Sequence, residues 1–271
     1  MNTKLSVDTP LKTLFDLSGR VALVTGGAGH LGKALVYALA ELGAHVVIAS
    51  RSKAHCDEAV QELIGRGFKA SALEIDIHNE ASQRQAVDQL LAAYGRFDVL
   101  VNNAYPFLEK SIDDISNDEF TNTIDAALAG TFRLSQLASL AMRKSDGGSV
   151  INIASMYGMV GSYPEVYKGT GGCISPAYHA AKGGLLQLTR YLAVYWAEFN
   201  IRVNSISPGA FPKDSVKKDK PEFAARLEDK IPLRRFGHPA ELKGAVALLA
   251  SDAGRYLTGA NIIIDGGWTA W

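Results

Sequence analysis

The stretch VALVTGGAGHLGKALVYALAELG, residues 21–43, decides which fold we expect for this chain. It opens on a short apolar run without polar alternation, which favours a strand buried on both faces. Glycines follow, and then Leu and Ala recur at intervals of three and four until Gly43 ends the pattern, as on one face of a helix. A glycine-rich turn between a strand and a helix lets the backbone approach a pyrophosphate, which the helix N-terminus attracts. The stretch therefore predicts a dinucleotide-binding loop.

The loop fits two fingerprints. Under T-G-x-x-x-G-x-G, His30 stands where the second glycine is expected, whereas Gly27-x-Gly29-x-x-Gly32 fits G-x-G-x-x-G without exception. Either way, we expect Gly26, Gly29, His30 and Leu31 to contact the cofactor, with His30 touching the pyrophosphate or capping the turn.

Outside the loop, strand-like runs and helical patterns alternate along the chain. This order predicts right-handed crossovers and a single doubly wound parallel sheet of about seven strands with helices on both faces, an α/β Rossmann fold. We divide the chain into an N-terminal extension, 1–18, and one domain, 19–271. The expected strands are 21–25, 45–50, 70–76, 98–103, 149–154, 201–207 and 261–265, and the expected helices lie near 31–42, 53–66, 79–94, 117–143, 176–199 and 239–251.

Bulk composition excludes several classes of protein. Lys+Arg and Asp+Glu both number 28, so no net charge favours nucleic acid or an acidic membrane surface. Two cysteines outside any ligand spacing, and no apolar run near the N-terminus, predict a cytoplasmic protein. The six histidines form no ligand cluster, so we expect no metal site.

Ligands of such sheets bind beyond the carboxyl ends of the strands. The second expected strand ends at Ser50-Arg51, and Lys53 follows closely. An enzyme that prefers NAD(H) would be expected to have a carboxylate here, which would bind the two free hydroxyls of the ribose. A hydroxyl beside a guanidinium suits a 2′-phosphate better, which favours NADP(H) and leaves NAD(H) possible. The alternative is a solvated arginine at a helix start.

Tyr178 and Lys182 are four residues apart and share a helix face. A nearby ammonium stabilises phenolate and is expected to lower the pKa of the tyrosine, which then exchanges a proton with a carbonyl or alcohol oxygen. Ser155, at the end of the preceding strand, can hydrogen-bond the same oxygen.

With the glycine loop and Asn102-Asn103-Ala104, these residues resemble the short-chain dehydrogenase/reductase family from Phe15 to Trp271. The resemblance implies that Tyr178 is the catalytic acid/base, that Lys182 also holds the nicotinamide ribose, and that Ser155 orients the substrate oxygen. It further implies cofactor contacts at Tyr178 and Lys182 themselves and at Asp76, Ile77, Asn103, Ala104, Pro208, Gly209 and Phe211. The loop itself, Thr25-Gly26 to Gly29 to Gly32, resembles that of the family's longer sugar-nucleotide branch.

Four positions depart from the family pattern. Tyr105 replaces the glycine of N-N-A-G, which is expected to narrow the mouth of the site, and Lys213 replaces a threonine. Ala127 stands in place of an asparagine whose main-chain carbonyl supports a water relay to the lysine, so we expect a weakened relay. Residues 161–176 form an insertion, either a decorated surface loop or a substrate rim. This insertion and V-N-N-A-Y-P resemble bacterial enzymes of flagellin modification and nonulosonate pathways.

The leading interpretation is an NADP(H)-dependent oxidoreductase acting on a secondary alcohol or ketone of a sugar, polyol or related hydroxy compound. One alternative is a 3-oxoacyl-thioester reductase. An alternative of another class is a non-catalytic NAD(P)-binding regulator, because His30 and Ala127 both depart from the enzyme pattern. The family resemblance also implies a small-molecule substrate and a homo-oligomer, a tetramer or dimer.

Overall fold

The computed structural model describes residues 5–106, 108–170 and 173–271. Within these residues the strands form one parallel sheet in the order β3-β2-β1-β4-β5-β6-β7, the doubly wound arrangement that the sequence predicts. The order reverses at β1 and β4, so the loops that follow these two strands lie on either side of a crevice. The strands are β1 (Val21–Thr25), β2 (His45–Ser50), β3 (Ala70–Glu74), β4 (Val99–Asn102), β5 (Gly148–Ile153), β6 (Ile201–Pro208) and β7 (Asn261–Ile264).

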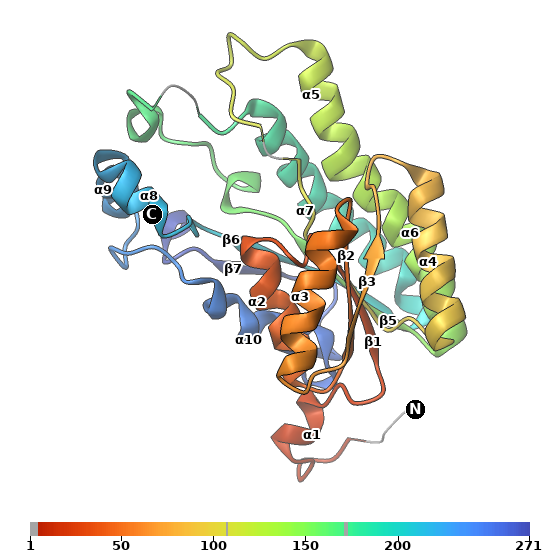
Figure 1. Cartoon of the computed structure of the whole chain (residues 1–271). Coiled ribbons are helices and arrows are strands. Elements are labelled where there is room, and N and C mark those ends of the chain that lie inside the picture. The colour runs from red at the N-terminus through yellow and green to blue at the C-terminus, as the bar shows by residue number, and fades with distance from the viewer. Residues whose placement is uncertain (1–4, 107, 171–172) are drawn as a thin grey trace.

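Helices cover both faces of the sheet (Figure 1). On one face lie α2 (His30–Glu41), α3 (Lys53–Gly65) and α10 (Lys243–Ala250). The other face carries α4 (Glu80–Tyr94), α6 (Thr131–Met142) and α7 (Pro176–Trp196), with α5 (Asn117–Ile124) extending beyond the sheet. Two short helices, α8 (Ser215–Asp219) and α9 (Pro221–Asp229), follow β6.

The strand interiors explain why two helical layers are needed. Alternate residues of β1 divide between the two cores: Ala22 and Val24 pack with α2 and α10, while Val21 and Leu23 pack with α4, α6 and α7. All of these side chains are buried, which is why β1 shows no polar alternation in the sequence. The sequence therefore identified the fold through its continuously apolar strands.

One expected helix is interrupted. Instead of a single helix over 117–143, α5 and α6 are joined by a π-helical turn, Asp125–Gly130. At its end Gly130 packs so closely on β3's following loop that a Cβ there would lie 2.3 Å from the Ile77 carbonyl oxygen. Helical spacing continues through both helices, so the sequence pattern did not indicate the wider turn.

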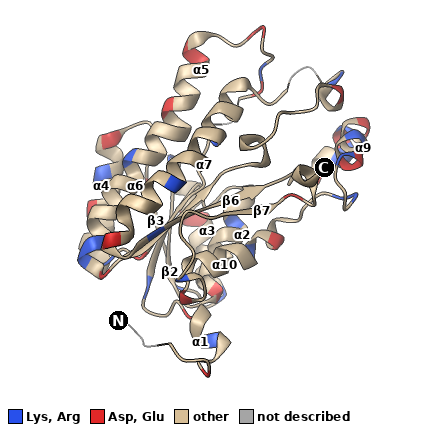
Figure 2. Cartoon of the chain, turned by 180° about the vertical axis from the view of Figure 1, so that it is seen from behind, with Lys and Arg blue, Asp and Glu red and all other residues tan. Residues whose placement is uncertain are grey.

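The segment before β1 is attached to the end of α2. After α1 (Leu11–Phe15), Leu17 is fully buried and its N–H donates to the Leu42 carbonyl at 2.8 Å. No helix among the described residues is long and apolar enough to cross a membrane. Charges of both signs are interspersed over α4 and α9 (Figure 2).

Candidate active site

The glycine-rich loop is shaped by contacts that leave no space for side chains. A Cβ on Gly32 would lie 2.1 Å from the Gly26 carbonyl oxygen, and Gly26 itself has a φ of +63°. Gly29 precedes α2 without a side-chain cap, so the first N–H groups of that helix are available to a ligand. The loop therefore forms a backbone cradle that presents free N–H groups, the geometry on which the predicted dinucleotide-binding loop depends.

A single hydroxyl braces this cradle. Thr25 Oγ1 donates to the Val101 carbonyl at 3.3 Å and accepts the N–H groups of Asn103 and Ala104, each at 3.0 Å. The Asn103 side chain donates to the carbonyls of Thr25 and Gly26 at 3.0 and 3.1 Å. Asn103 and Ala104 thus lie beside the loop, as expected, but the Asn103 amide is used to hold the loop itself.

Beside the cradle lies a cavity of about 530 Å³. Gly26, Gly29, Lys33, Ser50 and Glu62 are among the residues that line it. The Ser50 hydroxyl is engaged locally, since it donates to the Ser52 carbonyl at 3.0 Å. Lys33 pairs with Glu62 at 2.6 Å, so the charges of these two lining residues offset each other.

The two basic residues after β2 differ in availability. Lys53 pairs with Asp57 at 2.9 Å along α3 and is committed to that helix. Arg51 is exposed at the end of the strand, with no ion pair among the described residues. Of the two cations named from the sequence, Arg51 is the one that is free to meet a ligand.

The turn after β6 forms the opposite wall. Gly209 packs so tightly that a Cβ would lie 2.5 Å from the Asp265 Cα, and its N–H donates to the Ile264 carbonyl at 2.8 Å. His30 reaches across from the start of α2, where its Nε2 donates to the Phe211 carbonyl at 3.1 Å. His30 therefore links the two walls, and its side chain makes no cap hydrogen bond at the start of α2.

Ser155, Tyr178 and Lys182 come together at the carboxyl end of β5. Ser155 begins the turn after that strand. Its hydroxyl accepts the Tyr157 N–H at 3.1 Å and lies close enough to the Tyr178 phenol to lower the pKa of that group. Tyr178 stands in the first turn of α7, which Ser175 caps and Pro176 opens. One turn later, the buried Lys182 Nζ donates to the Ile153 carbonyl at 2.6 Å and lies 5.6 Å from the centre of the Tyr178 ring.

The electrostatics of this trio differ from the sequence expectation. Burial raises the pKa of Tyr178, and the hydrogen bond from Ser155 opposes the shift only in part. Burial also lowers the pKa of the Lys182 ammonium to about 8. The expected lowering of the tyrosine pKa is thus wrong for the protein by itself, because desolvation of the phenolate outweighs the nearby cation, which points at a backbone carbonyl.

Tyr105 lies directly on the trio. Its ring meets that of Tyr178 edge to face, with centroids 4.8 Å apart, and Lys182 Nζ lies 5.2 Å from its centre. The Tyr105 hydroxyl is buried and has no hydrogen-bond partner among the described residues. Burial, and then the Tyr178 phenol, raise its pKa, while the Ser175 hydroxyl acts in the opposite direction.

Ala127 lies in the π-helical turn, where its carbonyl oxygen accepts the Thr131 hydroxyl at 2.9 Å. The Lys182 ammonium, which the water relay of the family would reach, donates here to the Ile153 carbonyl. Nearby, Asn102 is a structural residue: its amide donates to Ser135 Oγ and Asn152 Oδ1, both at 2.9 Å.

The described part of the insertion, residues 161–170 and 173–176, contributes to the same aromatic cluster as Tyr178. Val166 is fully buried in an aromatic cluster with Trp268, and the hydroxyls of Tyr157 and Tyr167 are 2.9 Å apart. Arg226 of α9 donates to the carbonyls of Val166 and Lys168 at 3.1 and 2.8 Å. Sequence reasoning missed Arg226 and Trp268 because their contacts join segments far apart in the chain.

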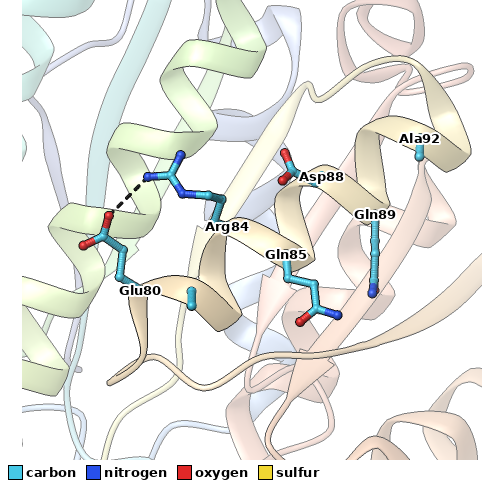
Figure 3. Close-up of a pocket in the computed structure, with 7 residues that line it drawn as sticks. Glu80, Arg84, Gln85, Asp88, Gln89 and Ala92 are labelled. Atoms are coloured by element: carbon cyan, nitrogen blue, oxygen red, sulfur yellow. Dashed lines mark hydrogen bonds and ion pairs between the residues drawn. The ribbon is translucent and has the colours of Figure 1, made fainter.

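A second face of the molecule carries a hollow of about 760 Å³ (Figure 3). All its lining residues belong to α4, and Glu80 and Arg84 pair across it at 3.2 Å. The opposite face of α4 packs against the sheet through Ala86, Val87 and Leu90. The hollow is therefore surface relief on one helix, separate from the Tyr178 centre.

Together, the cradle and the trio define a class of protein: a dinucleotide-dependent oxidoreductase. The fit to a nicotinamide dinucleotide rests on the Gly26–Gly32 cradle, the uncapped start of α2 and the adjoining cavity. A family model described as enoyl-(acyl carrier protein) reductase matches residues 26–269. The chain belongs to the short-chain dehydrogenase/reductase family, and it is an enzyme acting on CH–OH and C=O groups.

Relatives at about one-third identity align over nearly the whole chain. Cyclopentanol dehydrogenase of Comamonas testosteroni is 35% identical over 256 residues, covering 94% of this chain and 98% of that protein. The NAD-dependent glycerol dehydrogenase of Listeria innocua is 32% identical, with 94% and 96% covered. A crystal structure of gluconate 5-dehydrogenase from Burkholderia cenocepacia, in complex with NADP and tartrate, matches with a TM-score of 0.87 at 30% identity, covering 96% of this chain and 99% of that one.

Proposed function

We propose that this protein is an NADP(H)-dependent oxidoreductase that interconverts a secondary alcohol and a ketone of a sugar, polyol or related hydroxy compound. The observation that carries the proposal is the convergence of Ser155, Tyr178 and Lys182 beside the glycine cradle. Nicotinamide, when bound, accepts a hydride in the oxidation and donates one in the reduction.

The protein residues handle the substrate oxygen and its proton. Ser155 orients the oxygen, and Tyr178 Oη donates a proton to it in the reduction or takes the hydroxyl proton in the oxidation. The Lys182 ammonium stabilises the phenolate that the reduction leaves behind, and Ile153 holds that ammonium in place. Because burial raises the pKa of Tyr178 in the protein without bound cofactor, the phenol is protonated near neutral pH and can donate its proton in the reduction.

The preference for NADP(H) is supported by the end of β2. None of the residues 50–52 is acidic, so no carboxylate would repel a 2′-phosphate there. The exposed Arg51 guanidinium is available to bind one. Against this stands Glu62 in the adjoining cavity, whose charge Lys33 offsets. The Burkholderia structure contains NADP, whereas the Listeria enzyme is NAD-dependent by name, so the choice has to be measured.

The cofactor preference can be tested by comparing the NADPH and NADH affinities of two variants, Arg51→Ala and Lys53→Ala. Intact protein should bind NADPH more tightly than NADH in a fluorescence titration, and Arg51→Ala should reduce the difference about tenfold. Lys53→Ala, which removes a cation already paired with Asp57, serves as the matched control and should leave the difference unchanged. Tighter binding of NADH by the intact protein would overturn the NADP(H) assignment.

A polar substrate is supported by the glycerol and gluconate named for the relatives. We expect nicotinamide absorbance changes with polyols, aldonates or their ketones. Turnover confined to a 3-oxoacyl thioester would replace this proposal with the reductase alternative, and nicotinamide binding without turnover of any alcohol or ketone would leave no support for it.

A homo-oligomer is supported by an apolar face on α7. Tyr191, Val194 and Tyr195 are 53%, 75% and 58% exposed, and the two tyrosine rings stack at 4.4 Å. Light scattering of the purified protein should give a dimer or tetramer mass, and Val194→Glu should shift it toward monomer. Free Cys56 and Cys173 support the proposed cytoplasmic location.

A further inference from the structure

Tyr105 is held in the active site from both directions. The residue before it is fixed by the hydrogen bond from the Ala104 N–H to Thr25 Oγ1, at 3.0 Å. Its ring is packed against the ring of Tyr178 and lies next to the Lys182 ammonium. Because Tyr105 contacts the two residues proposed to act on the substrate oxygen, its side chain forms part of the substrate-binding surface.

The hydroxyl of that ring is unsatisfied. It is buried without a hydrogen bond in the described chain, whereas most buried polar groups have a partner. A polar side chain that faces it is Ser175, whose hydroxyl accepts the Tyr178 N–H at 3.3 Å; its interaction with Tyr105 lowers the pKa of that phenol but does not reach the geometry of a formed hydrogen bond. Because burial keeps Tyr105 protonated, its hydroxyl can both donate and accept at neutral pH.

We propose that the Tyr105 hydroxyl binds a second hydroxyl of the substrate, next to the carbon that is oxidised, and so selects vicinal diols and α-hydroxy ketones over simple alcohols and ketones. The proposal rests on the proposed function, since it takes the reacting oxygen to lie at Tyr178. With the two ring centroids 4.8 Å apart, Tyr105 reaches substrate atoms only a bond or two from the reacting carbon. Tyr105 is in this sense a specificity-determining residue.

The experiment compares two substrates that differ by one hydroxyl, cyclopentanol and cis-1,2-cyclopentanediol. Tyr105→Phe keeps the ring and removes the hydroxyl, so kcat/KM for the diol should fall about tenfold while the value for cyclopentanol stays within about twofold. The nicotinamide dissociation constant should not change. Tyr256→Phe, at a fully exposed tyrosine, is the matched control.

A binding readout separates this proposal from turnover. In Tyr178→Phe protein carrying ¹³Cζ-tyrosine and NADP⁺, the Tyr105 signal, assigned by its loss in a double variant with Tyr105→Phe, should shift with the diol and not with cyclopentanol. An equal loss for both substrates in Tyr105→Phe, or no loss, or an unshifted signal, overturns the role of the hydroxyl while leaving the proposed function intact. If the wild-type enzyme oxidises neither alcohol and reduces neither matching ketone, both proposals fail for this substrate class.

Discussion

The two sides of the crevice are built by different means. Beside β1 and β2, the proposed cofactor side consists of backbone: glycines, an uncapped helix start and one threonine. Beyond β4 and β5, the proposed substrate side consists of side chains: Ser155, Tyr178, Lys182, Tyr105 and an insertion packed on an aromatic cluster. Substitutions on the first side should therefore change cofactor affinity, and those on the second should change turnover or substrate KM.

The largest effect is expected for Tyr178→Phe. Removing the proton carrier should lower kcat by about 10³-fold, while the nicotinamide dissociation constant stays unchanged because the cradle is untouched. Steady-state kinetics and fluorescence titration measure the two quantities. Full turnover in this variant would remove Tyr178 from the chemistry.

Lys182→Met should change how stability depends on pH. The folded pKa of Lys182 is about 8 and its unfolded reference is 10.5, so between these values the unfolded chain binds more protons and the unfolding free energy rises with pH. Below pH 8 both states are protonated and the burial cost is constant. Methionine has no charge to desolvate. Between pH 7 and pH 10.5, the unfolding free energy of the wild type should therefore rise by about 3 kcal/mol relative to that of the variant.

Urea unfolding at several pH values measures this gap. Lys144→Met, at an exposed lysine, is the control and should show a gap that does not vary with pH. A flat gap for Lys182→Met as well would mean that the ammonium is not desolvated.

Gly32→Ala tests the cofactor side. The new Cβ would lie 2.1 Å from the Gly26 carbonyl, so the loop has to move and nicotinamide affinity should fall about 100-fold. Gly65→Ala adds the same atom where nothing lies within 4 Å, and it should bind the cofactor normally. Equal affinities of the two variants in a fluorescence titration would disprove the tight cradle.

The smallest effect is expected for Arg226→Met, which removes two hydrogen bonds to the insertion. The substrate KM should rise about threefold because the insertion that shares an aromatic cluster with Tyr178 loosens, with cofactor affinity unchanged. Arg190→Met, at an exposed arginine with a local partner on α7, is the control. Weakened cofactor binding in Arg226→Met would show that the two sides are not independent.

Local pattern was enough to predict the fold and the strand–glycine turn–helix that opens it. The strands were predicted within about two residues of their bounds, because unbroken apolar runs and glycine spacing are properties of adjacent residues. The placement of Ser155 and of the Tyr178–Lys182 pair followed from strand ends and helical spacing. Their roles, and those of the cofactor residues, remain predictions.

Long-range contacts account for what the sequence could not show. The insertion could be read as a surface loop or a rim, and its packing depends on Trp268 and Arg226, which lie far along the chain. The direction of the Tyr178 pKa shift depends on burial by Tyr105 and its surroundings. The narrower resemblance to flagellin-modification enzymes stays a prediction.

Thr25 gives the two sides a common anchor. Its hydroxyl has one proton and two lone pairs, and all three are spent, on Val101, Asn103 and Ala104. The glycine cradle follows Thr25 directly and Tyr105 follows Ala104 directly, so one oxygen atom sets the spacing between the phosphate end of the crevice and the aromatic wall. The Thr25 side chain therefore sets the distance between these two parts of the molecule. An isosteric valine at this position would keep the volume of the side chain but lose all three hydrogen bonds.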